Sequence, residues 1–345
     1  MKVKLKIIFL AFFSLIKFSS SWTLSSLNLT QNGTSIIHVS VYYNRAFLCL
    51  SHDYSDITPR PTFIESSWPE TLIGSKAKVF PNEIYFQKKK ANRCREVQQA
   101  KATDIDEKGR LWLIDEGNEI CAPKLFVFDL LYFNEEIHFT SFGLLQGKKF
   151  SKIIVDPVES ENGDVRAYLS LYNEDYLLVY SFDERKIGKL KFSNDFIQPS
   201  KSPSFSEMII TPQKDQMYIS DTTSGYLYTI NLAPIRYLNF SLGDSKKLSI
   251  RSPLTYVGQL LGPPKAMTIN KSGILVYIIP RFSAVAMWDP KTPLAAEWHE
   301  IVYQTNHELV QLLCGSKGSV YVISEKVVKI SRDGKWKHSV KIHME

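Results

Sequence analysis

The chain has 345 residues and a formal net charge of +7 at pH 7. Length alone allows two domains, but no Pro/Ser-rich linker or low-complexity segment divides the sequence, so we expect one domain. Four of the lysines, Lys2, Lys4, Lys6 and Lys17, lie in an N-terminal leader. Without the leader the charge falls by four to +3, and this modest charge gives no support for a nucleic-acid partner.

Residues 1–21 have the features of a signal peptide. Three lysines are followed by the apolar residues 7–16 and then by the small residues Ser19, Ser20 and Ser21. The apolar run is too short for a convincing membrane span. We therefore predict a secreted, extracellular protein without a membrane-spanning segment.

Six units with the same strand pattern follow in chain order. Each has a strand segment, a short polar or Gly-containing turn and a second strand rich in aromatic and branched residues. The first segments are SIIHVSV, KATDID, SKIIVD, SEMIIT, PKAMTIN and LVQLLCG, and the second strands occupy residues 45–51, 110–115, 166–171, 216–221, 274–279 and 319–324. The segments TFIESS, KLFVFDL, YLLVYSF, YLYTINL, AVAMWDP and VVKISRD offer a third strand to each unit.

The spacing between units, roughly 45 to 65 residues, is typical of four-stranded propeller blades. We predict an all-β fold, a six-bladed β-propeller that forms a single domain over residues 22–345. A propeller must close into a ring. Residues 22–34 or residues 337–343 are the candidates to complete the outer edge of a terminal blade.

Asp106 to Gly109 and Asn270 to Gly273 are turns between strands, and they also bear on metal binding. Asp104, Asp106 and Asp115 superficially resemble alternating calcium ligands, but Lys108 falls at a ligand position and a strand hairpin explains the turn better. The sequence has no nucleophile elbow, no phosphate-binding Gly loop and no H-E-x-x-H motif. We predict no metal, no cofactor and no catalytic residue.

Four cysteines suit an oxidising compartment and lack the close pairs of a structural zinc site. Cys94 and Cys121 flank one strand pair, and we predict a disulfide between them. Cys49 and Cys314 lie in the first and last units, which become neighbours when the ring closes; they either bridge or remain buried thiols. Four sequons predict glycosylation, at Asn28, Asn32, Asn239 and Asn270.

The loops that leave the second strand of each blade converge on one face of a propeller, and this predicts a ligand site at the channel mouth. The candidate residues are His52, Asp53, Asp115, Glu116, Tyr172, Asn173, Asp221, Thr222, Arg281, Phe282 and Glu325. Acidic groups outnumber Arg281, which favours a compact organic cation, and Tyr172 or Phe282 could give it an aromatic face. The structural alternative is that Asp115 and Asp221 cap turns, Arg281 pairs with a carboxylate and Tyr172 packs.

Residues 88–90 with Arg93 and Arg95 form a local basic run that either contacts a polyanion or is a solvated loop. We favour the solvated loop. The aromatic residues Trp112, Tyr168, Tyr218, Tyr277 and Tyr321 are expected to pack between blades.

Several motifs resemble the insect Yellow / major royal jelly protein family. They are KATDIDEKGRLWLIDEG, the run from Cys121 to Leu130, VYYNRAFLCLS, the element Phe80-Pro81-Asn82, RAYLSLYNEDYLLVYSF and GPPKAMTINKSGILVYIIPRFSAVAMWDP. The resemblance covers nearly the whole chain after the leader. It implies a secreted six-bladed propeller with a Cys94–Cys121 bridge.

The chain also departs from the family pattern. Ala122 replaces a proline, Gly163 and Asp164 stand where a cysteine is usual, and residues 324–326 differ from the common Ser-Asn/Asp-Arg. These departures identify a divergent member and weaken the transfer of ligand chemistry, particularly at Glu325.

Three functions follow from the resemblance and the rim. The first is non-enzymatic binding of a small amine or catechol-like ligand at the channel mouth. The second is an extracellular structural or developmental factor, in cuticle pigmentation or eggshell, that contacts matrix components through its surface. The third is a dopachrome-converting isomerase, which would need a placed acid or base such as His52 or Glu116. The sequence gives no prediction of the oligomeric state.

Overall fold

The structure is a computed structural model that describes residues 27, 29, 33–52, 60–68, 77–82, 94–193, 204–237, 249–314, 320–324 and 341–342. The predicted signal peptide, residues 1–21, lies outside the described residues, as does the segment VVKISRD. Strands dominate the described part, which contains one helix of four residues, α1 (Ala233–Arg236). No helix in these ranges is long and apolar enough to cross a membrane.

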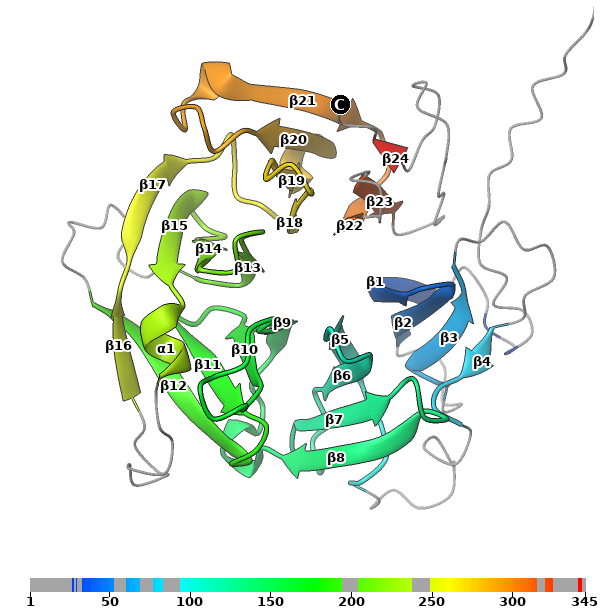
Figure 1. Ribbon diagram of the computed structural model, residues 1–345. Helices are drawn as coiled ribbons and strands as arrows, with labels where there is room; N and C mark the ends of the chain where they lie inside the picture. The colour runs from blue at the N-terminus through cyan, green and yellow to red at the C-terminus, as the bar shows by residue number, and fades with distance from the viewer. Residues whose placement is uncertain are drawn as a thin grey trace, which may run out of the picture.

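The strands form six sheets arranged around a central axis (Figure 1). Sheet 1 contains β1 (Thr34–Tyr42), β2 (Arg45–His52), β3 (Phe63–Ser67) and β4 (Lys78–Val79). Sheet 2 contains β5 (Ala100–Ile105), β6 (Arg110–Asp115), β7 (Lys124–Asp129) and β8 (Glu135–Ser141). Sheet 3 contains β9 (Phe150–Val155), β10 (Arg166–Leu171), β11 (Tyr176–Ser181), β12 (Lys186–Ser193) and β16 (Ser249–Pro253).

Sheet 4 contains β13 (Glu207–Ile210), β14 (Gln216–Ser220), β15 (Tyr226–Asn231) and β17 (Thr255–Gln259). Sheet 5 contains β18 (Met267–Ile269), β19 (Leu275–Ile279), β20 (Ala284–Trp288) and β21 (His299–Gln304). Sheet 6 contains β22 (Leu309–Cys314), β23 (Val320–Ser324) and β24 (Lys341–Ile342).

The innermost strands of neighbouring sheets contact one another in sequence, and β22 returns to β1, so the described strands close a ring. The prediction of an all-β propeller is therefore confirmed. The predicted number of complete blades differs from what is observed: five sheets have at least four strands, and sheet 6 has three in the described part. Residues 341–342 pair with β23, so the C-terminal of the two candidate segments joins the last sheet.

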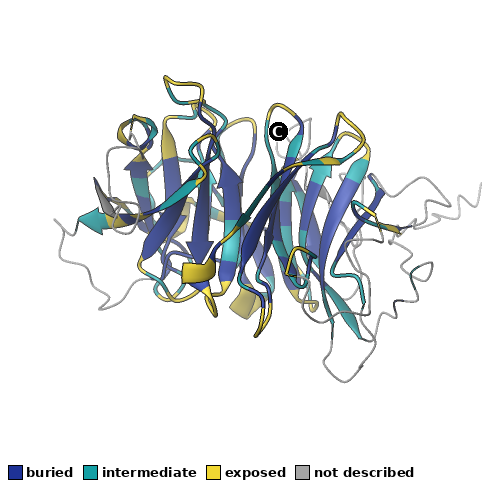
Figure 2. Cartoon of the chain, turned by 90° about the horizontal axis from the view of Figure 1, so that it is seen from below, coloured by how far each residue is buried: buried dark blue, intermediate teal, exposed yellow. Residues whose placement is uncertain are grey.

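The sheets stand side by side, so their central strands are covered on both faces and are buried along most of their length (Figure 2). Aromatic rings fill the spaces between them. Trp112 meets Tyr180 and Phe182 between sheets 2 and 3, and Trp68 packs edge-on against Tyr321 between sheets 1 and 6. The aromatic strand residues predicted as core are buried or partly buried, as expected.

In two hairpin turns a side-chain oxygen accepts hydrogen bonds from backbone N–H groups of the turn. Asp106 Oδ1 accepts from the backbone N–H of Lys108 and of Arg110, at 3.0 and 2.9 Å. Asn270 Oδ1 holds Ser272 and Ile274 in the same way. The hairpin interpretation of both turns is therefore confirmed.

One outer strand departs from simple antiparallel order. β16 pairs in parallel with β12 at the edge of sheet 3, while β17, only two residues later, pairs with β15 in sheet 4. The segment 249–259 thus joins the outer edges of two sheets (Figure 1). Residues that are far apart in sequence make this edge, so the repeat pattern gave no signal for it.

Candidate functional site

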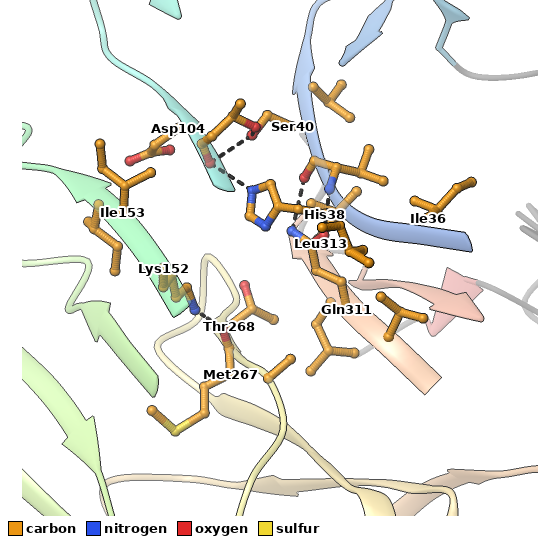
Figure 3. A pocket seen from close by; sticks show the side chains of 18 of the residues that line it. Ile36, His38, Ser40, Asp104, Lys152, Ile153, Met267, Thr268, Gln311 and Leu313 are labelled. Atoms are coloured by element: carbon orange, nitrogen blue, oxygen red, sulfur yellow. Dashed lines mark hydrogen bonds between the residues drawn. The ribbon is translucent and has the colours of Figure 1, made fainter. Parts of the chain in front are cut away.

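The innermost strands surround a central cavity of about 1070 Å³, a size suited to a small organic molecule. Polar side chains from all six of these strands line its wall, together with Tyr172 from the loop after β10. They include His38, Lys101, Asp104, Lys152, Glu207 and Gln311. Figure 3 shows His38, Asp104, Lys152 and Gln311, which come from different strands around the channel.

His38 on β1 has a fixed tautomer. Its Nε2 lies 2.7 Å from the backbone carbonyl oxygen of Thr103. A carbonyl can only accept, so Nε2 carries the hydrogen and Nδ1 is left as an acceptor. Burial, together with the positive charges of Lys152 and Lys101, lowers the pKa of His38 to about 4, although the bond to Thr103 acts the other way. His38 is thus a neutral hydrogen-bond acceptor in the channel wall.

Lys152 on β9 bridges three inner strands. Its Nζ donates to Glu207 Oε2 on β13 and to the carbonyl oxygen of Met267 on β18, each at 3.2 Å (Figure 3). The backbone N–H of Met267 also donates to Glu207 Oε2. Burial raises the pKa of Glu207, and Lys152 partly offsets this rise. The charge of Lys152 is therefore balanced within the channel wall.

Asp104 on β5 ties sheet 2 to sheet 3. Its Oδ2 accepts from the backbone N–H of Val155 at 2.7 Å, and its Oδ1 accepts from the N–H of Ile105. Burial raises the pKa of Asp104 to about 6, against the opposing effect of these two bonds. Asp104 is a structural group whose protonation can change at mildly acidic pH.

Of the predicted rim residues, Tyr172 lines the cavity. Its ring is 45% exposed, and the Nζ of Lys101 lies 5.2 Å from the ring centroid. The backbone N–H of Tyr172 donates to the carbonyl of Lys149 at the start of β9. The second strand of sheet 3 therefore delivers Tyr172 to the channel mouth, as the repeat pattern predicts.

Asp115 and Asp221 do not line the cavity. Both residues are fully buried, and their carboxylates accept hydrogen bonds in turns. Asp115 accepts from the backbone N–H of Gln98, Gln99 and Gly117, and Lys124 Nζ lies 3.4 Å from its Oδ2. These contacts match the structural alternative, in which such carboxylates cap turns. For Asp115, the structure therefore shows a turn-capping carboxylate and not a residue that lines the cavity.

The turn after β14 repeats this arrangement. Asp221 Oδ1 accepts from the N–H of Ser204 and of Thr223, each at 3.0 Å, and Oδ2 accepts from Ser224 Oγ. Burial alone would raise the pKa of Asp221, but these hydrogen bonds outweigh it and the pKa is lowered. Thr222 Oγ1 accepts from Ser206 Oγ at 3.0 Å.

Two further candidates are held by backbone groups. Glu116 Oε1 accepts from the N–H of Phe150 at 2.8 Å, and burial raises its pKa although Lys101 opposes the rise. His52 lies 3.1 Å from Thr34 Oγ1 through Nδ1 and 2.9 Å from the carbonyl of Pro61 through Nε2. Both side chains brace the ends of strands and do not line the cavity.

Arg281 and Phe282 form an exposed 3-10 turn after β19, where the Arg281 guanidinium lies 5.8 Å from the Phe282 ring. Asn173 takes a left-handed conformation and its N–H donates to Ser204 Oγ. None of these three residues lines the cavity. Asp53 and Glu325 lie outside the described residues.

The residues that do line the channel belong mainly to the first strand of each unit. The predicted site residues instead lie at or after the end of the second strand. The sequence signal of the lining residues is a polar side chain within an apolar strand, as in His38 of SIIHVSV, Lys101 and Thr103 of KATDID, and Lys152 of SKIIVD. Because the innermost strand has one edge in the channel, such polar residues line the cavity although the strand is otherwise apolar.

The disulfide between Cys94 and Cys121 is present, with a Cα–Cα distance of 5.0 Å, as predicted. Cys49 and Cys314 are not bridged. Cys49 packs among the phenylalanines between sheets 1 and 2, whereas Cys314 is at the end of β22 and lines the cavity. The two side chains therefore face different neighbours.

Asn270 is 2% exposed and its side chain holds a turn, so glycosylation at this sequon would require the turn to open. Asn28, Asn32 and Asn239 lie outside the described residues, as do Lys88, Lys89, Lys90 and Arg93. Arg95 pairs with Glu136 at 2.6 Å. Within the described ranges, no three His, Cys, Asp or Glu side chains gather where they could hold a metal ion.

A family model described as "Major royal jelly protein" matches residues 98–343, well over half of the chain. The chain belongs to the major royal jelly protein family. Major royal jelly protein 1 of Apis mellifera is 24% identical over 65% of this chain and 56% of its own length. Major royal jelly protein 2 of the same species is 26% identical over 65% of this chain and 53% of its own length.

This membership confirms the resemblance seen in the sequence. The chain spans about half the length of these curated relatives.

Solved structures share the fold at much lower identity. An auxiliary nutrient binding protein from Bacteroides thetaiotaomicron has a TM-score of 0.52 and 10% identity, with 89% of this chain and 73% of that chain covered. Virginiamycin B lyase from Staphylococcus aureus has a TM-score of 0.50 and 11% identity, with 85% of this chain and 79% of that chain covered. These similarities support the propeller architecture alone.

Proposed function

We propose that this major royal jelly family member is a secreted, non-enzymatic protein that binds a small amine or catechol-like molecule in its central channel. The supporting observation is the cavity of about 1070 Å³, whose wall combines apolar strand residues with a few fixed polar groups. Such a mixture is typical of small-molecule sites. The proposed ligand site is therefore the channel itself and not the acidic rim that the sequence predicts.

The neutral His38 suits a hydroxylated aromatic ligand, since its Nδ1 can accept a hydrogen bond from a phenolic hydroxyl group. The half-exposed ring of Tyr172 offers a face for stacking. Secretion is supported by the Cys94–Cys121 disulfide, because such bonds persist in oxidising compartments. In this proposal sheet 6 is the sixth blade of the ring.

Calorimetric titration of the oxidised protein with dopamine, serotonin, octopamine, histamine and dopachrome tests the proposal. Saturable binding of at least one compound is expected. A Ser151→Phe variant places a ring in the channel wall and should lose this binding by at least tenfold. Ser141→Phe makes the same change on the exposed outer strand β8 and should bind as the unmodified protein does. Absence of saturable heat with all five compounds and with 3,4-dihydroxyphenylalanine would refute the proposal.

A second candidate function, contact with extracellular matrix, is favoured by an exposed apolar patch on the opposite face from Tyr172. Tyr43, Leu131, Tyr132 and Phe133 are all more than 60% exposed. The backbone of Gly109 packs between Tyr42 and Leu131, so these turns lie together. If the titrations show no binding and a variant with Tyr132 and Phe133 changed to Ser loses retention on matrix, this function replaces the first.

Catalysis is the third candidate, and His38 is the specific group that favours it. Its unprotonated Nδ1 is the type of base that a proton transfer requires. Following dopachrome absorbance during the titration tests this directly. Catalysed loss of dopachrome that disappears in His38→Gln would establish an isomerase, whereas loss that persists would exclude His38 as its base.

A further inference from the structure

Lys101 differs from the other two lysines that line the channel. Lys152 is paired with Glu207 at 3.2 Å, and Lys265 is paired with Glu308. Within the described part of the chain, no carboxylate comes within ion-pair distance of Lys101, and its Nζ lies 5.2 Å from the centroid of the Tyr172 ring. Among the described residues of the channel wall, Lys101 is therefore the lysine without an ion-pair partner, although the wall also contains the carboxylate of Asp104.

The carboxylate of Glu116 interacts electrostatically with Lys101, but these two described side chains do not form an ion pair. Glu116 is held through Oε1 by the N–H of Phe150, and Glu174 on the same rim is paired with Lys148. Lys149 adds further positive charge close to Glu116. Among the described residues at this part of the mouth, Lys101, Lys148 and Lys149 outnumber Glu116 and Glu174.

We propose that Lys101 and Tyr172 form a subsite for the carboxylate and ring of an aromatic acid, so that the ligand class is hydroxylated aromatic amino acids, not their decarboxylated amines. The subsite rests on the proposed function, since it lies in the same channel. A lysine ammonium has three donors for a carboxylate, and a tyrosine ring packs on a second aromatic ring at offset or edge-on geometry.

Lys101 and Tyr172 lie close enough together to contact the same small ligand. Lys101 lies at the start of β5 and Tyr172 just after β10, so adjacent sheets contribute one group each to the same side of the mouth. A carboxylate bound at Lys101 would give this lysine the ion-pair partner that the described residues do not supply. A compact cation at this position would instead face repulsion from Lys101.

The test compares 3,4-dihydroxyphenylalanine with dopamine, which differ by a single carboxylate, in calorimetric titrations of the full chain. The amino acid should bind at least tenfold more tightly. Lys101→Met should remove this advantage, and Lys101→Gln, which keeps a polar side chain, should do the same if the charge is what matters. Tyr172→Ala should weaken both ligands.

Lys148→Met is the matched control, because it removes the same charge from the same rim at a lysine that does not line the cavity. It should keep the preference within twofold. Dopamine that binds as tightly as the amino acid, or a preference lost equally in Lys148→Met, would overturn the subsite while leaving channel binding intact. If neither 3,4-dihydroxyphenylalanine nor any of the four titrated amines nor dopachrome binds, the proposed function fails together with the subsite.

Discussion

Asp115 and Asp221 occupy equivalent positions in sheets 2 and 4 and do equivalent structural work. Each follows the second strand and accepts backbone N–H groups from the residues that precede the first strand, Gln98 and Gln99 in one case and Ser204 in the other. Each also accepts from the residue two positions later. A carboxylate at this position therefore fastens two strand ends together, and the sequence pattern alone could not separate this role from a ligand site.

Asp115→Ala should reduce the free energy of unfolding by about 3–5 kcal/mol, because it leaves Lys124 and three backbone N–H groups buried without their acceptor. Denaturant unfolding measures the change. Asp175→Ala, at an exposed position in the turn before β11, should change it by less than about 0.5 kcal/mol. Equal effects of the two substitutions would contradict the structural role of Asp115.

Asp104 gives a pH-dependent prediction at the same scale. Its pKa is about 6 in the folded protein and 3.8 without the fold. Between these values the folded chain binds more protons than the unfolded chain, so this carboxylate lowers stability as the pH rises from about 4 to about 6. Asp104→Asn should therefore gain stability relative to the unmodified protein across this window, by up to about 1.4 kcal/mol per pH unit. A pH-independent difference would show that the pKa of Asp104 is not raised.

The strands are the elements that the sequence predicts best. The first and second strands of all six units coincide with observed strands, because a sheet covered on both faces requires long apolar runs such as RLWLID and YLLVYSF. The predicted third strands coincide with observed strands in the first five sheets. The sixth, VVKISRD, lies outside the described residues. The parallel β16 and the placement of Gln311 depend on partners far along the chain, and local pattern gives no information about them.

The Cys94–Cys121 bridge joins the segment before β5 to the segment before β7 across a sequence separation of 27 residues. A variant with both cysteines changed to serine should lose about 3–4 kcal/mol of stability, from the restriction that a loop of this length places on the unfolded chain. Comparing the denaturant midpoints of the variant and the oxidised protein measures this loss. An unchanged midpoint would show that sheet 2 holds these segments without the bridge.

A side chain makes hydrogen bonds across the junction of sheets 6 and 1, where the ring of sheets closes. Gln311 on β22 accepts from the N–H of Val39 at 2.6 Å and donates to the carbonyl of Val39 at 2.9 Å. The amide thus pairs with β1 as a strand would, across 272 positions of sequence. Val39 is almost fully buried, so water does not readily replace this pairing.

Gln311→Ala should cost about 2–3 kcal/mol, because both backbone groups of Val39 lose their partner. Hydrogen exchange should then accelerate in β1 and β22 more than in β10, which is on the far side of the ring. Gln304→Ala, at an exposed end of β21, is the control and should have little effect. Uniform acceleration over all the sheets would indicate general destabilisation and not opening at the closure.

At this scale the central claim is that the channel is the ligand site. A crystal structure of the oxidised protein with 3,4-dihydroxyphenylalanine tests it most directly. We expect density for the compound inside the channel, with its carboxylate within hydrogen-bond distance of Lys101 Nζ and its aromatic ring against Tyr172. A fully liganded crystal with the compound bound elsewhere, or with the channel empty, would contradict it.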